Sequence, residues 1–149
     1  MKTTLDAGVR QEVLQRLEQL KPDAQTLWGK MAVEQMLRHL RLWEEMIHEN
    51  KRYPRPFIGR LIGQLIMKQV LSKSELPRDT PTIPEMRITD EGIDFNDERD
   101  KLAALLDSYA TYNMPDYTFI HPFFGKMTRA QVGRMAYMHV DHHLRQFGA

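Results

Sequence analysis

The segment TRAQVGRMAYMHVDHHLRQFG, residues 128–148, decides the fold, because it carries a complete helix signature and three of the six histidines. Thr128 and Gln131 have the spacing of a capping box, and Gly148 is a typical helix terminator. Between these signals, apolar residues recur every three or four positions, the period of one buried helix face: Val132, Met135, Ala136 and Phe147. The segment therefore predicts a helix that ends at Phe147 and packs on one side.

Helical periodicity also dominates the rest of the chain. Apolar stripes predict three helices and the start of a fourth, over residues 6–20, 31–50 and 57–71 and from Asn96 or Asp97 onward. The most apolar of them, residues 57–71, is too short for a bilayer and is interrupted by Arg60 and Lys68. We therefore expect it to be a packed helix.

Two proline-containing stretches, residues 76–95 and 113–127, show no sustained period and are predicted to be loops, although residues 86–95 also suit a short hairpin. A length of 149 residues is that of about one domain. We expect a single all-α domain over residues 1–149. Its simplest architecture is a four-helix bundle, with an extra helix and a long loop in the crossover between helices two and three.

The composition excludes several classes of protein. With no cysteine, the chain has no disulfide framework, thiolate nucleophile or cysteine-based metal site. A net charge of +1 provides no overall field for nucleic acid or an anionic membrane. The N-terminus MKTTLDAGVR lacks the apolar stretch of a signal peptide. These features predict a soluble cytoplasmic protein that binds neither nucleic acid nor membrane.

The histidines of the closing segment have the spacing of a metal site. His139 and His143 are four residues apart, so they share one helix face, and that face coincides with the apolar stripe. His142 falls on its flank, and Asp141 is predicted to face solvent. An HxxxH pair alone is also compatible with two core histidines, so the interpretation depends on a third ligand.

His39 supplies that ligand if two helices run antiparallel. It lies on the apolar face of the helix over residues 31–50, about 12 Å from its start. The midpoint of His139 and His143 lies about 9 Å from the end of the last helix. Antiparallel helices place all three imidazoles at one level. Three neutral imidazoles suit a divalent transition metal and leave a coordination position open.

Other polar residues have subordinate predicted roles. His142 and Gln146 are candidates to border the site or to orient a ligand. The loop over residues 76–95 is expected beside the site, so its Arg78, Glu85 and Arg87 are candidates to contact a substrate. His121 is expected at the far end of the bundle, and His48 is expected to be structural or on the surface.

Three segments, LWGKMAVEQMLRHL, TPTIPEM and HPFFGKMTRAQVGRMAYMHVDHHLRQFG, resemble the DinB/YfiT-like superfamily, and a branch of it classed as a domain of unknown function. The resemblance implies an up-down-down-up four-helix bundle and a metal site at His39, His139 and His143. Related proteins bind divalent metal, often nickel or zinc, and many form dimers, which leaves a homodimer open. Their characterised members are transferases and isomerases that use small thiols such as bacillithiol or mycothiol.

The leading hypothesis is therefore a divalent-metal-dependent enzyme with a three-histidine site and a small-molecule substrate. It would be a transferase that uses a low-molecular-weight thiol, or a hydrolase, for which Glu34 and Glu45 are weak candidates as general base. No catalytic residue is assigned. The alternatives are a non-catalytic metal-binding bundle and an interaction module without metal.

Overall fold

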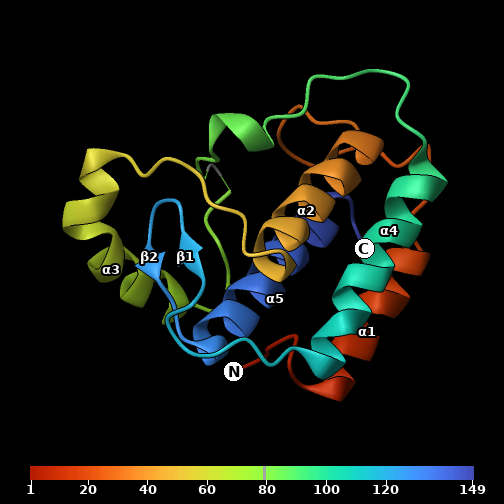
Figure 1. Ribbon diagram of the computed structural model, residues 1–149. Coiled ribbons are helices and arrows are strands. Elements are labelled where there is room, and N and C mark those ends of the chain that lie inside the picture. Colours follow the sequence, from red (N-terminus) through yellow and green to blue (C-terminus); the bar gives the residue numbers. More distant parts are fainter. Residues whose placement is uncertain (79) are drawn as a thin grey trace.

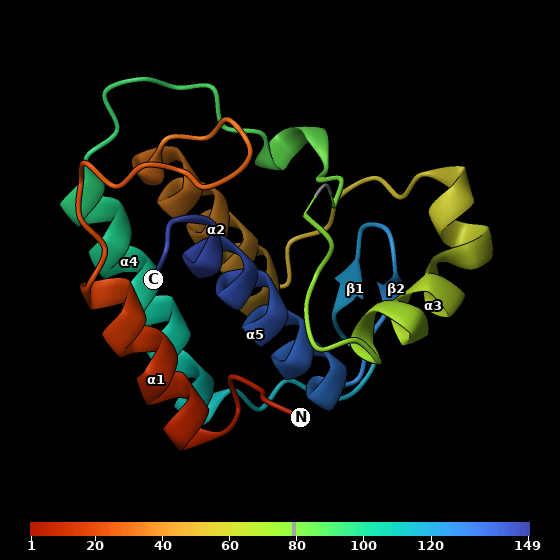
Figure 2. The same cartoon turned by 180° about the vertical axis from the view of Figure 1, so that it is seen from behind.

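The computed structural model describes residues 1–78 and 80–149 and is mostly helical, as the all-α prediction required (Figures 1 and 2). Its elements follow the chain in the order α1 (Ala7–Glu18), α2 (Val33–His48), α3 (Phe57–Leu71), a 3-10 turn η1 (Pro84–Met86), α4 (Phe95–Asp107), a second turn η2 (Ser108–Thr111), β1 (Ile120–His121), β2 (Gly125–Lys126) and α5 (Arg129–Gln146).

The helix ends agree with local capping signals. In α5 the Thr128 side chain accepts the backbone N–H of Gln131, and the Gln131 side chain accepts that of Thr128. This is the reciprocal capping box that the sequence predicted. The expected start of α4 at Asn96 or Asp97 is slightly late, because Asp94 is the N-cap and accepts the backbone N–H of Asp97 at 2.9 Å.

The short hairpin lies in the second predicted loop. β1 pairs with β2 in antiparallel register, Ile120 opposite Lys126 and His121 opposite Gly125. Gly125 has φ +83°, a conformation that glycine adopts without a Cβ clash. Residues 86–95, all of which the structure describes, contain no strand, so the hairpin considered for them does not form. Their first residue, Met86, ends η1, and their last, Phe95, begins α4.

Helices α2 and α5 form the part of the core that positions the candidate site. The two helices contact each other, and in addition α2 packs on α4 and α5 packs on α1. Figure 1 shows that α2 and α5 run in opposite directions. On the α4 side, Nε of Arg38 on α2 donates a hydrogen bond to the carboxylate of the buried Glu98 at 2.8 Å. The fully buried apolar side chains from these helices include Leu17, Met36, Leu40, Ile47, Leu102, Leu106, Val140 and Leu144.

Helix α3 stands apart from the other helices and contacts mainly the hairpin, with additional contacts to α5 (Figure 2). Only Gly59, Gly63 and Met67 of this helix are buried. The expectation of a packed helix is therefore correct for one face and wrong for the other. No helix within the described residues is both long and apolar enough to cross a bilayer.

Candidate metal centre

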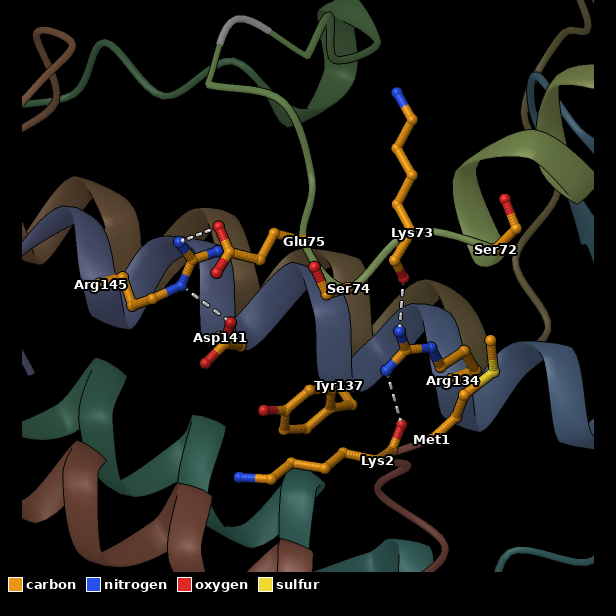
Figure 3. A pocket seen from close by; sticks show the side chains of 10 residues that line it. All are labelled: Met1, Lys2, Ser72, Lys73, Ser74, Glu75, Arg134, Tyr137, Asp141 and Arg145. Atoms are coloured by element: carbon orange, nitrogen blue, oxygen red, sulfur yellow. Dashed lines mark hydrogen bonds and ion pairs between the residues drawn. The ribbon is translucent and has the colours of Figure 1, made fainter.

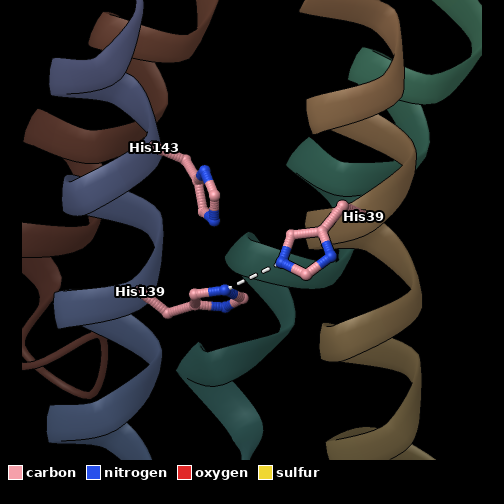
Figure 4. A group of neighbouring side chains, drawn as sticks. All are labelled: His39, His139 and His143. Carbon is pink, nitrogen blue, oxygen red and sulfur yellow. Dashed lines mark hydrogen bonds between the residues drawn. The ribbon is translucent and has the colours of Figure 1, made fainter. Parts of the chain in front are cut away.

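Three histidine side chains meet between α2 and α5 (Figure 4). His39 comes from α2, and His139 and His143 come from successive turns of α5. Their ring centroids form a nearly equilateral triangle, 5.0 Å from His39 to each of the others and 4.9 Å between His139 and His143. One nitrogen of each ring lies within 4.8 Å of the other two. The structure thus brings together the residues that the sequence selected.

The backbone of the long loop fixes the orientation of His39. Its Nδ1 lies 2.8 Å from the carbonyl oxygen of Met86. A carbonyl oxygen only accepts, so the ring hydrogen is on Nδ1 and the lone pair is on Nε2. Nε2 is the nitrogen that faces the other two histidines (Figure 4).

A side-chain amide fixes His143 in the same way. Nδ1 of His143 lies 2.8 Å from Oε1 of Gln146. The amide nitrogen of Gln146 donates to the carbonyl of Trp28 at 2.7 Å. The Trp28 carbonyl therefore determines which end of the amide is the oxygen, and that oxygen must accept from Nδ1–H of His143. The lone pair of His143 is again on Nε2, as a metal ligand requires.

His139 differs from the other two histidines, because it has no outer partner. Its Nε2 is 3.1 Å from Nε2 of His39, and its Nδ1 is buried with no hydrogen-bond partner among the described residues. Two nitrogen ligands at about 2.1 Å from one ion are roughly 3.0–3.4 Å apart, so this pair has the separation of two ligands on one metal. The donor set and this spacing fit a divalent transition metal.

Burial keeps the three rings neutral at pH 7. Burial lowers the pKa of His39 and of His139, and it lowers the pKa of His143 to about 3. The neighbouring imidazoles add to this effect at His139 and His143, since two cations at this distance repel each other. Neutral imidazole is the form that binds a metal, so no proton has to be displaced at neutral pH.

A short aromatic chain borders the site. The His142 ring is 5.0 Å from that of His143 and 5.8 Å from the indole of Trp28. The Arg78 guanidinium lies over the same indole, 4.6 Å from its centroid, and its side chain is exposed. His142 is itself buried, so the predicted flank position is an internal one.

Besides Arg78, the long loop reaches the site through its backbone rather than through its charges. Glu85 and Arg87 are exposed on either side of the buried Met86, whose carbonyl holds His39. Of the two glutamates considered as general base, Glu45 pairs with Arg41 and Lys51, and Glu34 is half-buried in the first turn of α2. The cluster of possible metal ligands includes neither glutamate.

His121 lies closer to the site than expected. Its ring is 6.4 Å from that of Trp43, which lies 4.7 Å from that of His139. Nδ1 of His121 accepts the backbone N–H groups of Phe123 and Phe124, both at 3.1 Å. The expectation of a remote His121 is wrong because the hairpin folds back beside α2. His48 packs its ring on Tyr109 and Tyr112, in agreement with a structural role.

Asp141 is a second correction. We expected it to face solvent, but it is 8% exposed and lies between two arginines, Arg16 at 2.8 Å and Arg145 at 2.9 Å. Arg16 belongs to α1, which packs on this side of α5. The periodicity of α5 identified its most apolar face but not this polar contact face.

A cavity of about 490 Å³ lies along the same side of α5, around Tyr137 and Asp141 (Figure 3). At one end Arg134 donates to the carbonyls of Lys2 and Lys73, and at the other Arg145 pairs with Glu75 and Asp141. These contacts tie the N-terminal segment and the residues that follow α3 to α5. None of the three metal-ligand candidates lines this cavity.

Sequence reasoning missed two contributors to the site, the carbonyls of Met86 and Trp28, because a backbone carbonyl carries no sequence signal.

A family model described as protein of unknown function (DUF1569) matches residues 1–149. The chain belongs to the DUF1569 family. No curated protein and no solved structure matches it. The geometry of this DUF1569 chain therefore has to carry the functional argument.

Proposed function

We propose that this protein is a divalent-metal-dependent enzyme whose metal ligands are Nε2 of His39, His139 and His143. The observation that carries the proposal is the fixed orientation of His39 and His143, whose outer nitrogens donate to Met86 and Gln146. Metal-binding histidines generally have such an outer partner. Two histidines that only fill the core would not need their Nε2 lone pairs directed at a common point, as those of His39 and His143 are.

Three protein ligands leave room for a further ligand on the metal. His39 and His143 are buried, and His139 is the least covered of the three residues, although its Nδ1 is buried. A divalent ion held by these three histidines would supply Lewis acidity and would lower the pKa of a water or thiol bound to it. The chain's own part is to hold three neutral imidazoles and, through Arg78 on Trp28, to offer a cation near the rim.

The finer assignment rests on the resemblance to the DinB/YfiT-like superfamily. We propose that α1, α2, α4 and α5 correspond to its four-helix bundle, with α3 and the long loop in the crossover. We propose nickel or zinc as the metal and, as the reaction, a group transfer that depends on a low-molecular-weight thiol, with hydrolysis as the alternative. Because the chain has no cysteine, the thiol must be a cosubstrate. A homodimer and a cytoplasmic location are part of the same proposal.

Metal analysis of the purified protein tests the site. After incubation with nickel or zinc and removal of the excess, we expect about one ion per chain, retained in His48→Ala and lost in His143→Ala. His48 is a suitable control, because it is also a half-buried histidine of this fold but lies away from the cluster. Equal and near-zero metal in all three proteins would disprove the site.

Cobalt substitution then separates an enzyme from a structural metal site. If a coordination position is open, adding 2-mercaptoethanol to the Co²⁺ protein produces a sulfur-to-metal charge-transfer band. If His142 closes the site, the spectrum does not respond to the thiol but changes in His142→Ala. That second result would favour a non-catalytic metal-binding fold, in which the ion only ties α2 to α5.

A further inference from the structure

The outer face of α3 is an exposed apolar stripe. Phe57, Leu61 and Leu65 occupy successive turns and are 74%, 64% and 70% exposed. Ile58 and Ile62 lie beside them and are 51% and 38% exposed. Single exposed apolar residues are common on protein surfaces, but five on one helix face form a contiguous patch of the kind that marks an interaction site.

The opposite face of α3 is locked, so the stripe cannot turn inward. A Cβ on Gly59 or Gly63 would lie 2.7 Å or 2.2 Å from the carbonyl oxygen of Phe123, which shows how closely the helix approaches the hairpin backbone. Gln64 also donates to the carbonyls of Phe124 and Lys126, at 2.6 and 2.8 Å. The hairpin therefore holds the helix with its apolar stripe facing outward.

The charged residues of α3 and of the segments next to it in the sequence have one sign. Residues 51–73 contain six basic residues and no Asp or Glu: Lys51, Arg52, Arg55, Arg60, Lys68 and Lys73. Because the whole chain carries +1 and this segment carries +6, the rest of the chain carries −5. Arg60 and Lys68 lie on α3 itself, are exposed, and form no ion pair within the described residues. Lys51 pairs with Glu45 and Glu49, so the unpaired positive charge beside the apolar stripe comes from Arg60 and Lys68.

We propose that the outer face of α3 docks on a bilayer surface that contains anionic phospholipids. Phe57, Leu61 and Leu65 enter the boundary between headgroups and acyl chains, while Arg60 and Lys68 meet the lipid phosphates. A helix that lies in the plane of the interface combines an apolar face with basic residues in this way. The low net charge of the whole chain hides this feature, which is why composition alone predicted no membrane contact.

A second copy of the chain fits this face less well than a bilayer. Pairing two α3 faces brings two basic segments together without a carboxylate from residues 51–73 to compensate them. The contact area is also small. A helix of 15 residues is about 22 Å long and about 10 Å wide, a footprint of roughly 220 Å². A stable protein interface needs about 800 Å² on each partner.

Vesicle flotation with the full chain tests the proposal. We expect the protein to float with phosphatidylcholine vesicles that contain about one third phosphatidylglycerol, and not with phosphatidylcholine alone. Raising the salt from low to about 0.5 M should lower the bound fraction, because the attraction of basic residues to anionic lipid is screened. Leu61→Ser/Leu65→Ser should weaken binding at least tenfold, and Arg60→Gln/Lys68→Gln should reduce its salt dependence.

The matched control is Leu27→Ser, since Leu27 is 68% exposed but lies in the loop before α2. It should float like the wild type. All these side chains are exposed, so circular dichroism and thermal unfolding should show intact folds. No flotation at low salt would overturn the proposal, as would flotation that survives Leu61→Ser/Leu65→Ser. A dimer in light scattering that this double variant dissociates, without vesicle binding by the wild type, would assign the face to a second copy instead.

Discussion

Gln146 connects His143 to Trp28 through the two ends of one amide, with Oε1 2.8 Å from Nδ1 of His143 and Nε2 2.7 Å from the Trp28 carbonyl. The side chain of Gln146 is 4% exposed, so water does not readily replace these contacts. The imidazole of His143 is therefore held in one tautomer and one orientation before any metal binds.

The first prediction follows from this arrangement. Gln146→Ala should lower the affinity for nickel or zinc by about 10–100-fold, the usual effect of removing an outer partner of a ligand histidine. At saturating metal the stoichiometry should stay at one ion per chain, because the three ligands remain. Competition with a chelator of known affinity measures the change.

Gln11→Ala is the matched control for this measurement, because Gln11 is exposed on α1. It should leave the affinity unchanged. An affinity for Gln146→Ala equal to that of the wild type would show that Gln146 does not orient the ligand.

The histidine cluster could be predicted from the sequence because each part of it has a local signal. His139 and His143 share an apolar helix face by their spacing, and His39 lies on the apolar face of α2. Only one relative direction of the helices places them at one level. Periodicity and the rise per residue are properties of a single helix, so they can be predicted without knowing how the helices pack.

The errors arose where partners come from elsewhere in the chain. Asp141 is buried because Arg16 of a different helix reaches it. His121 approaches Trp43 because the hairpin folds beside α2, and two strands of two residues carry too weak a pattern to predict that. The outer face of α3 is exposed although a packed helix was expected, because apolar periodicity identifies apolar faces but not what covers them.

The second prediction concerns stability. Nickel or zinc at about 100 times its Kd should stabilise the native state by about 2.7 kcal/mol, if the unfolded chain does not bind it. For a chain of this length that raises Tm by roughly 5–10 °C. His142→Ala should show the same shift, whereas His39→Ala should show none. Differential scanning fluorimetry measures it, and an equal shift in His39→Ala would point to binding elsewhere.

The third prediction is a pH dependence that arises from Glu44. This carboxyl is fully buried, its Oε2 accepts the Tyr109 hydroxyl at 2.7 Å, and its Oε1 has no partner among the described residues. Burial raises the pKa of Glu44 to about 8, from an ordinary value of 4.5. Between these two values the native state holds a proton that the unfolded state has lost.

The stabilising effect of this proton is therefore complete below pH 4.5 and is lost as the pH rises to about 8. The loss is at most about 1.4 kcal/mol per pH unit. Glu44→Gln cannot ionise, so its free energy of unfolding should fall less than that of the wild type between pH 5 and pH 8. Urea unfolding at several pH values measures the difference between the two proteins. The buried histidines are the same in both, so their own pH dependence cancels in this difference. Parallel pH curves for the two proteins would contradict a raised pKa.

The fourth prediction tests the buried ion pairs of Asp141. Asp141→Asn should reduce the free energy of unfolding by about 1–3 kcal/mol, because Arg16 and Arg145 both lose a charged partner in a site of low exposure. Lys101→Gln is the control, since its pair with Asp97 is exposed and should matter by less than about 0.5 kcal/mol. Urea unfolding compares the two variants, and equal small losses would show that water screens both sites alike.

The fifth prediction concerns the contact between α3 and the hairpin. Gly63→Ala would place a Cβ 2.2 Å from the carbonyl oxygen of Phe123, so the helix and the hairpin must separate. The better helix propensity of alanine offsets only about 1 kcal/mol of this strain. We expect a net loss of about 1–2 kcal/mol, because overpacking a close contact typically costs 1–3 kcal/mol.

A local readout distinguishes this separation from general destabilisation. The backbone N–H groups of Phe123 and Phe124 donate to Nδ1 of His121, and their hydrogen exchange should become faster in Gly63→Ala. Amides in the middle of α4 should exchange as in the wild type under conditions where exchange occurs by local opening, because α4 packs mainly on α2 and α1. Gln69→Ala, an exposed position on α3, should change neither set. If Gly63→Ala leaves the exchange of Phe123 and Phe124 unchanged, the hairpin does not fix the orientation of α3, and its apolar stripe is free to turn toward the core.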